Sequence, residues 1–383
     1  MARELTRILI LALAISACSA PEASVPSPTA SQPSVTSTPT VRPSVDLLAA
    51  LLEPQVPSWK PTEPTLLVTI VRQQEGTLVA VPLSGAPATP LATIDDLSGS
   101  VPALVLAVSR LDGSLIAFAL ATSATTRNIA LLDLAAGKAR WVTTPAAAGS
   151  MAGAPAWAVD GNSLYYGSSD PSTRGLSHVG VDGTALPAVP LDPAFGSLLS
   201  VSRVTQEGTL FGADEFNGPT LWAVDLATGR KVSFGEHNSA LVAWRSSPPR
   251  ALVSAVTSIA APGAGYLALW DDATAQKTVI LTEPVAGADF DPTGARIVAA
   301  VTDRGDQQLR LRVMQADGSG AATLAGTENA RDPLWTDGGI VYHTYVPTGP
   351  NELRIVPPGG GSSRVLYRTN DTIQRAQLIV PAH

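Results

Sequence analysis

A sequence unit recurs about every 45 residues along this chain of 383 residues, and this recurrence limits the fold more than any other feature. Each copy has an aromatic or small residue, a tight turn ending in glycine and then an apolar run, as in residues 157–166 and 290–299. The turn positions are Gly113, Gly161, Gly208, Arg250, Gly294 and Gly338, so that successive spacings run from 42 to 48 residues. A period of this length, with about four short strands in each unit, is typical of a β-propeller.

A second hairpin signal follows the first within each unit. An alternating strand ends in Asp, and an Ala/Thr-Gly turn starts the next strand, as in residues 128–138 and 220–230. The chain contains 32 Gly and 32 Pro, which excludes a long helical bundle, and a single Cys, which excludes a disulfide scaffold. The sequence therefore predicts an all-β fold of four-stranded antiparallel blades, with strands a to d in chain order.

The number of blades follows from the length of the repeating region. Residues 65 to 383 number 319, which suits seven units of about 45 residues; six blades is the alternative. Residues 65–71, 77–83 and 88–94 provide only three strands at the start, whereas residues 374–380 form a lone strand at the end. We expect this C-terminal strand to complete the N-terminal blade, which closes the ring and removes a free edge.

The repeat resembles the TolB-type, WD40-like propeller repeat. The resemblance rests on a W-x-x-D-G-x-x-(I/L)-x-(F/Y) unit followed by an L-x-(L/V)-x-D-x-x-(T/A)-G-x hairpin, and it covers residues 65 to 383. The third copy lacks the Trp and the Asp, and the fourth has Pro-Pro-Arg in place of Asp-Gly. The resemblance implies the fold more than a function, since its members include periplasmic scaffolds, peptidase-associated propellers and a few polysaccharide lyases.

The N-terminal segment predicts export and anchoring. Residues 1–17 combine a basic start with a short apolar run, as in a signal peptide, and residues 15–18 (Ile-Ser-Ala-Cys) resemble the bacterial lipobox, with Cys18 as the lipidated residue. An ordinary signal-peptidase site beside a chance Cys is the alternative. Residues 18–64 then read as a tether, with ten Pro between residues 19 and 64. We expect a bacterial lipoprotein, anchored outside the cytoplasm by its N-terminus.

Charge and motifs exclude several function classes. The net charge of −7 argues against nucleic acid as a partner. The chain has no G-x-S-x-G elbow and no H-E-x-x-H or C-x-x-C pair, and its four histidines fall at different places in their repeats. The sequence therefore predicts no catalytic residue, no metal site and no cofactor, with Ca²⁺ as the one exception, discussed next.

Carboxylates recur in the loops that join strand d of one blade to strand a of the next. These d–a loops share one face of a propeller, around the mouth of its channel. The predicted acidic ring consists of Asp95, Asp96, Asp192, Glu236, Glu283, Glu328 and Asp371. Concentrated negative charge there would favour Ca²⁺ or a cationic partner. The alternative is that these residues stabilise turns on a solvated rim.

The b–c loops are expected on the same face, and their variable lengths suit recognition. The candidate contact residues in loops of this face are Asp214, Glu215, His237, Arg304, Asp306 and Tyr345. We therefore expect a non-enzymatic binding or scaffolding module for a protein or peptide of the cell envelope. A polysaccharide lyase or hydrolase acting on cell-wall or extracellular glycan is the alternative function.

Overall fold

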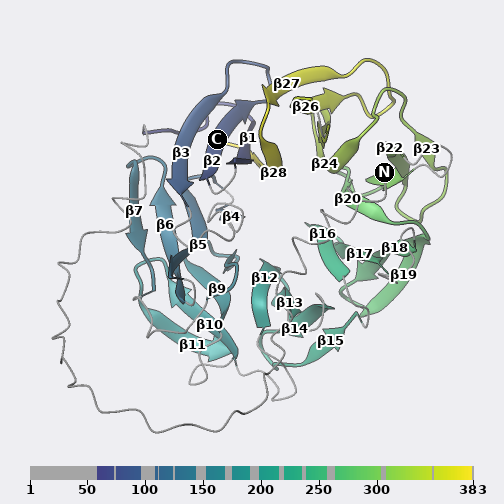
Figure 1. Ribbon diagram of the computed structural model, residues 1–383. Coiled ribbons are helices and arrows are strands. Elements are labelled where there is room, and N and C mark those ends of the chain that lie inside the picture. Colours follow the sequence, from purple (N-terminus) through teal and green to yellow (C-terminus); the bar gives the residue numbers. More distant parts are fainter. Residues whose placement is uncertain are drawn as a thin grey trace, which may run out of the picture. The chain divides into compact units, whose positions relative to one another are not determined.

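The chain folds as seven four-stranded antiparallel sheets arranged in a ring, as the repeat predicts (Figure 1). The computed structural model describes residues 58–72, 75–95, 108–110, 112–123, 126–143, 152–168, 175–189, 198–214, 220–234, 239–256, 264–302, 308–346 and 349–381. All elements within these residues are strands. The seven-bladed prediction is confirmed, and the six-bladed alternative is wrong.

The blades follow one another in chain order, and we number them 1 to 7. Blade 1 consists of β28 (Thr372–Ile379), β1 (Thr65–Arg72), β2 (Glu75–Pro82) and β3 (Thr89–Asp95). Blade 2 consists of β4 (Val108–Ser109), β5 (Leu115–Ser123), β6 (Thr126–Asp133) and β7 (Lys138–Trp141). Blade 3 consists of β8 (Ala156–Trp157), β9 (Ser163–Ser168), β10 (Gly175–Gly180) and β11 (Ala185–Val189). Blade 4 consists of β12 (Leu198–Val204), β13 (Thr209–Asp214), β14 (Thr220–Asp225) and β15 (Lys231–Ser233).

Blades 5 to 7 complete the ring. Blade 5 consists of β16 (Ser239–Ser246), β17 (Pro249–Val256), β18 (Gly265–Asp271) and β19 (Gln276–Leu281). Blade 6 consists of β20 (Val285–Phe290), β21 (Arg296–Thr302), β22 (Leu309–Gln315) and β23 (Ala322–Thr323). Blade 7 consists of β24 (Ala330–Thr336), β25 (Gly339–Thr344), β26 (Asn351–Val356) and β27 (Arg364–Thr369). Strand a of each blade lies nearest the centre of the ring (Figure 1).

The C-terminal strand closes the ring as expected. Strand β28 pairs antiparallel with β1, from Thr65 opposite Ile379 to Val71 opposite Thr372. Ile379 is 2% exposed and belongs to a core cluster that also contains residues of blades 1 and 2. Each blade thus buries apolar faces against its neighbours, because one twisted sheet has no other way to cover both faces.

The recurring turns have the conformations that their sequences require. Gly113 and Gly294 end the a–b turns of blades 2 and 6 with φ of +69° and +73°, a region that residues with a Cβ rarely enter. In the c–d turns an aspartate accepts backbone N–H groups of the turn; the Oδ1 of Asp225, for example, accepts from Ala227 and Thr228. The glycine and aspartate of the repeat therefore specify hairpin geometry.

The segment before blade 1 is described only from Ser58. The backbone N–H of Trp59 donates to the carbonyl of Leu134 at 2.8 Å, and the indole packs against the core cluster of blades 1 and 2. The predicted signal peptide, Cys18 and most of the predicted tether lie outside the described residues. Within the described residues, no helix is long and apolar enough to cross a membrane.

Candidate binding face around the d–a loops

Three residues of the predicted acidic ring are described, and all three lie in d–a loops. Glu283 lies between β19 and β20, Glu328 between β23 and β24, and Asp371 between β27 and β28. Asp95 ends β3, although its side chain lies outside the description. Asp96, Asp192 and Glu236 lie outside the described residues. The described members thus share the face that the repeat predicts for them.

Two of these carboxylates are paired with arginines of one strand. Glu283 contacts Arg312 with Oε2 and Nη1 2.5 Å apart, and Glu328 contacts Arg310 with Oε1 and Nε 3.7 Å apart. Both arginines come from β22, at alternate positions that place them on one face of the strand. The pairing offsets part of the negative charge on which the acidic-ring prediction rests.

Metal binding at this face stays a prediction. Among the residues that the structure describes, no three His, Cys, Asp or Glu side chains lie close enough together to hold one ion. Ca²⁺ takes six to eight oxygen ligands, so the paired Glu283 and Glu328 would need several more oxygens.

The innermost strand of blade 7 has an irregularity at Asp332. The register of β24 with β25 shifts between Arg331 and Leu334, and Asp332 has a φ of +44°. Its side chain is 61% exposed, and its Oδ2 lies 3.0 Å from Nε2 of His343 on β25. A non-glycine residue held in the left-handed region is uncommon and is found preferentially at functional sites.

The residue before this aspartate forms a cation–π pair. The guanidinium of Arg331 lies over the ring of Tyr345, 5.2 Å from its centroid, which is cation–π geometry. Tyr345 follows β25 at the start of the b–c loop, as predicted. The structure does not describe the side chains of the other predicted contact residues. Of Asp214 only the position at the end of β13 is described, and the rest lie outside the described residues: Glu215, His237, Arg304 and Asp306.

Two further charged residues belong to strands a nearer the centre of the ring. Asp289 of β20 accepts the backbone N–H of Trp335 at 2.8 Å and that of Phe290 at 2.9 Å. Its side chain keeps some exposed surface, yet partial burial raises the pKa of the carboxyl group to about 7, although these two hydrogen bonds lower it. Desolvation by the surrounding protein lowers the pKa of Arg203 on β12, although this residue keeps exposed surface and the charge of Asp289 opposes the shift. Neither residue belongs to the predicted acidic ring or to the predicted contact residues.

Hydroxyl groups at or directly after three d–a loops were missed by sequence reasoning. Oγ1 of Thr143 accepts the backbone N–H of Ile129, Oγ of Ser239 that of Leu221, and Oγ1 of Thr327 that of Leu311, at 2.8 to 3.1 Å. In each case a side chain at the crossing to the next blade is bonded to strand c of the preceding blade. Ser and Thr are too frequent in this chain for such a pattern to stand out in the sequence.

The two described internal histidines do not converge. His178 lies on β10 of blade 3, where its Nε2 lies 2.8 Å from Oγ of Ser163, and His343 lies on β25 of blade 7. The lyase alternative would need histidines and arginines around one substrate. His237 and His383 lie outside the described residues, so the lyase alternative stays a prediction.

Comparison with known proteins supports the fold. No protein-family profile and no curated protein matches the chain. Among solved structures, the β-propeller domain of the Trilobed protease from Pyrococcus furiosus superposes with a TM-score of 0.51 at 14% identity, over 84% of this chain and 99% of that domain. The likeness is one of fold. That domain has an open velcro topology, whereas here β28 completes the first blade.

Two other similar structures illustrate the range of proteins that share this architecture. A puromycin-hydrolyzing peptidase from Mycobacterium tuberculosis superposes with a TM-score of 0.51 at 15% identity, over 82% of this chain and 56% of the peptidase. TolB from Acinetobacter baumannii matches at 17% identity and a TM-score of 0.47, over 71% of this chain and 67% of that one. This chain therefore spans about half the length of the peptidase. The seven-bladed propeller expected from the TolB-type repeat is confirmed as a fold by the sheet order.

Proposed function

We propose that the protein is a membrane-anchored extracytoplasmic lipoprotein whose propeller binds a protein or peptide of the cell envelope on the face of the d–a and b–c loops. The observation that supports this most directly is the irregular strand at Asp332. It presents an exposed carboxylate, and the preceding residue, Arg331, pairs with Tyr345, so that both charges and an aromatic ring come from adjacent strands of blade 7. Tyrosine and arginine are enriched among the residues that dominate binding energy at interfaces.

The binding face is tested by site-specific photo-crosslinking in native membranes. A photoreactive phenylalanine analogue replaces Tyr345 in one variant and Val159 in the control. Val159 is 44% exposed and lies in the a–b turn of blade 3, on the opposite face. We expect one discrete adduct from position 345, absent from position 159 and lost when Asp332→Ala is added. Equal adducts from both positions, or an adduct indifferent to Asp332, would refute the proposed face.

The anchor is tested separately. Cys18→Ser removes the only Cys of the chain. We expect the wild type to incorporate an alkyne-labelled fatty acid and to sediment with membranes, and Cys18→Ser to do neither. Labelling that survives the substitution would exclude Cys18 as the lipidated residue. This result would leave the crosslinking test of the binding face unaffected.

A further inference from the structure

Two Asp-Pro peptide bonds lie within the described chain, and the structure holds them differently. Asp332-Pro333 lies in β24 of blade 7, and Asp291-Pro292 lies at the a–b turn of blade 6. An Asp-Pro bond is open to attack by its own side chain, because the carboxyl group can close a five-membered ring on the carbonyl carbon of the same residue and the proline nitrogen leaves as an amine. The attacking and the attacked group are therefore together at both bonds, and the local conformation decides their reactivity.

The backbone of Asp332 is strained. Its φ is +44°, a left-handed conformation that residues with a Cβ rarely adopt. A residue before proline favours extended backbone, with φ of about −120°. Gly287 of β20 holds this conformation from the neighbouring blade, since a Cβ at that position would lie 2.6 Å from the Cα of Asp332. Strain that the surrounding structure maintains in this way is released when the chain is cut.

The peptide bond after Asp332 lies outside the regular pairing of β24. The register pairs Arg331 with His343 and Leu334 with Val341, so that the two residues between fall in the irregularity. The side chain of Asp332 is 61% exposed, and its Oδ2 lies 3.0 Å from Nε2 of His343. No donor among the described residues forms a hydrogen bond to Oδ1. One carboxyl oxygen of Asp332 is thus available to react.

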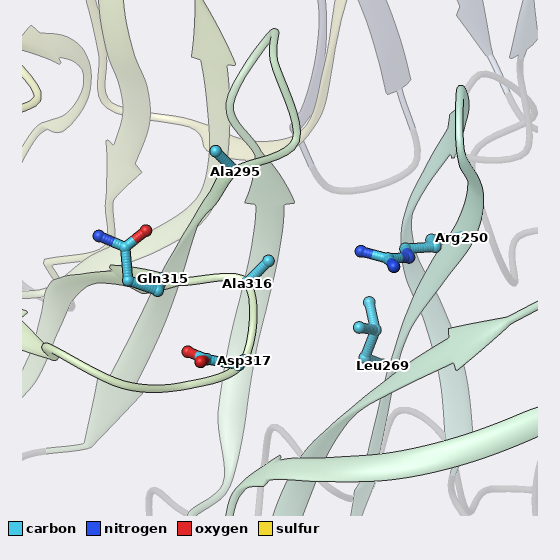
Figure 2. A pocket seen from close by; sticks show the side chains of 6 residues that line it. All are labelled: Arg250, Leu269, Ala295, Gln315, Ala316 and Asp317. Atoms are coloured by element: carbon cyan, nitrogen blue, oxygen red, sulfur yellow. The ribbon is translucent and has the colours of Figure 1, made fainter.

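The carboxyl group of Asp291 is held in place by several donors. Oδ1 accepts the hydroxyl of Thr293 at 3.0 Å and the backbone N–H of Arg296 at 3.2 Å, and Oδ2 accepts Nε of Arg296 at 3.3 Å. The carbonyl of Asp291 accepts the N–H of Gly294 at 2.8 Å, and its φ lies outside the left-handed region. Ala295 of the same turn lines a cavity toward blade 5 (Figure 2). This bond provides an unstrained reference within the same chain.

We propose that Asp332-Pro333 is a self-cleavage site, at which the side chain of Asp332 cuts the chain on its own C-terminal side. In its acid form, the carboxyl group adds through one oxygen to the carbonyl carbon of Asp332. The bond from this carbon to the nitrogen of Pro333 breaks, and the carboxyl proton passes to that nitrogen. Pro333 is buried, so the attacking group and not bulk water provides the proton. One water molecule then opens the five-membered anhydride and leaves Asp332 with a free carboxyl terminus. The proposal does not depend on the proposed binding function.

The test compares the rates of the two cuts in the folded and the unfolded chain. The purified protein is incubated at pH 4, either folded, as checked by near-UV circular dichroism, or in concentrated guanidinium chloride. Samples are denatured before mass spectrometry, because β28 would still pair with β1 after a cut. In the folded chain we expect fragment 333–383 to form at least about tenfold faster than fragment 292–383, which corresponds to about 1.4 kcal/mol of released strain.

In guanidinium chloride the two bonds should break at similar rates, because the conformational difference between them is lost. Absence of fragment 333–383 from the folded chain would overturn the proposal, and so would equal rates of the two cuts there.

Two matched variants assign the reaction to Asp332. Asp332→Glu keeps the charge but needs a six-membered ring, and we expect it to abolish the cut after residue 332. Asp291→Glu makes the same change at the reference bond and should leave that cut unchanged. Thermal unfolding confirms that both variants are folded. Formation of fragment 333–383 from Asp332→Glu at the rate of the wild type would show that another agent, such as a protease, makes the cut.

Discussion

The carboxylate of Asp289 accepts the backbone N–H of Trp335 at 2.8 Å and so joins the innermost strands of blades 6 and 7. The other oxygen accepts the N–H of Phe290. Blade-to-blade contact in this ring is mostly apolar packing, which has little directional preference. A buried carboxyl group with two backbone donors adds a directional contact between blades, and it also makes stability sensitive to pH.

Asp289 should make the folded state less stable as pH rises from 4 to 7. Its pKa is about 7 in the folded protein and about 3.9 in an unfolded chain, so that over this interval the folded state holds more protons. The stabilisation that protonated Asp289 gives the folded state is complete below the pKa of the unfolded chain and is lost as pH rises through about 7. The free energy of unfolding falls over this interval by at most about 1.4 kcal/mol per pH unit. Urea unfolding at pH 5, 6, 7 and 8 measures this decrease.

Asp289→Asn isolates this contribution. The asparagine cannot ionise, and one of its two terminal atoms can no longer accept an N–H. We therefore expect the variant to be less stable than the wild type at pH 5. The difference in the free energy of unfolding should shrink toward pH 8, because only the wild type loses stability as pH rises. Asp225→Asn is the control, because hydrogen bonds to its turn lower the pKa of that exposed carboxyl group. A constant difference between Asp289→Asn and wild type from pH 5 to 8 would show that Asp289 is ionised throughout.

Thr327 should matter more for stability than its size suggests. It is fully buried, its Oγ1 accepts the N–H of Leu311 at 3.1 Å, and its hydroxyl donates to the carbonyl of Leu324 at 2.7 Å. Thr327→Val keeps the shape and leaves both backbone groups without a partner, at a cost of about 1 to 3 kcal/mol. Thr327→Ser retains the hydroxyl. We expect chemical denaturation to rank wild type and Thr327→Ser above Thr327→Val; equal stability of the two variants would argue against the hydrogen bonds.

The repeat in the sequence predicts the hairpins because their causes are local. Gly113 and Asp225 specify turns through their own backbone freedom and hydrogen bonds, and the sequence shows both. The described acidic residues Glu283, Glu328 and Asp371 lie in d–a loops, whereas the acidic ring as a whole stays a prediction. Their ion pairs were not predicted, since Arg310 and Arg312 become neighbours of Glu328 and Glu283 only when the four strands of blade 6 assemble.

The conformation of Asp332 depends on contacts from another blade. A Cβ placed on Gly287 of β20 would lie 2.6 Å from the Cα of Asp332, so the two strands approach closely only because residue 287 is glycine. The register of β24 shifts at the same place, and Asp332 is exposed beside His343. The sequence Asp-Pro at residues 332–333 indicates a local irregularity but cannot reveal which side chain it exposes.

His178 should titrate below the usual range for histidine. Burial lowers the pKa of this imidazole, and the ring of Tyr165 is stacked on it, with centroids 4.1 Å apart and planes 9° apart. Neutral His178 stabilises the folded protein. This stabilisation is complete above the pKa of histidine in the unfolded chain, about 6.5, and is lost as pH falls through the lower pKa of His178 in the folded protein. An NMR titration of the four histidines measures the pKa of His178. Tyr165→Ala should move the pKa back toward 6.5; a value of 6.5 or above in the wild type would contradict the prediction.

The C-terminal strand should contribute a large share of the stability of the ring through Ile379. This side chain is 2% exposed within the core of blades 1 and 2, and its Cγ2 lies against Gly113 of the next blade. Ile379→Ala removes three buried carbon atoms, and such substitutions cost about 2 to 5 kcal/mol. Val380→Ala is a matched control on the adjacent residue, because Val380 is 51% exposed and its truncation should change stability by less than about 0.5 kcal/mol. Thermal and urea unfolding of both variants give the comparison. If the two variants unfolded alike, β28 would be dispensable for closure, and the edge of β1 would have to be stable without it.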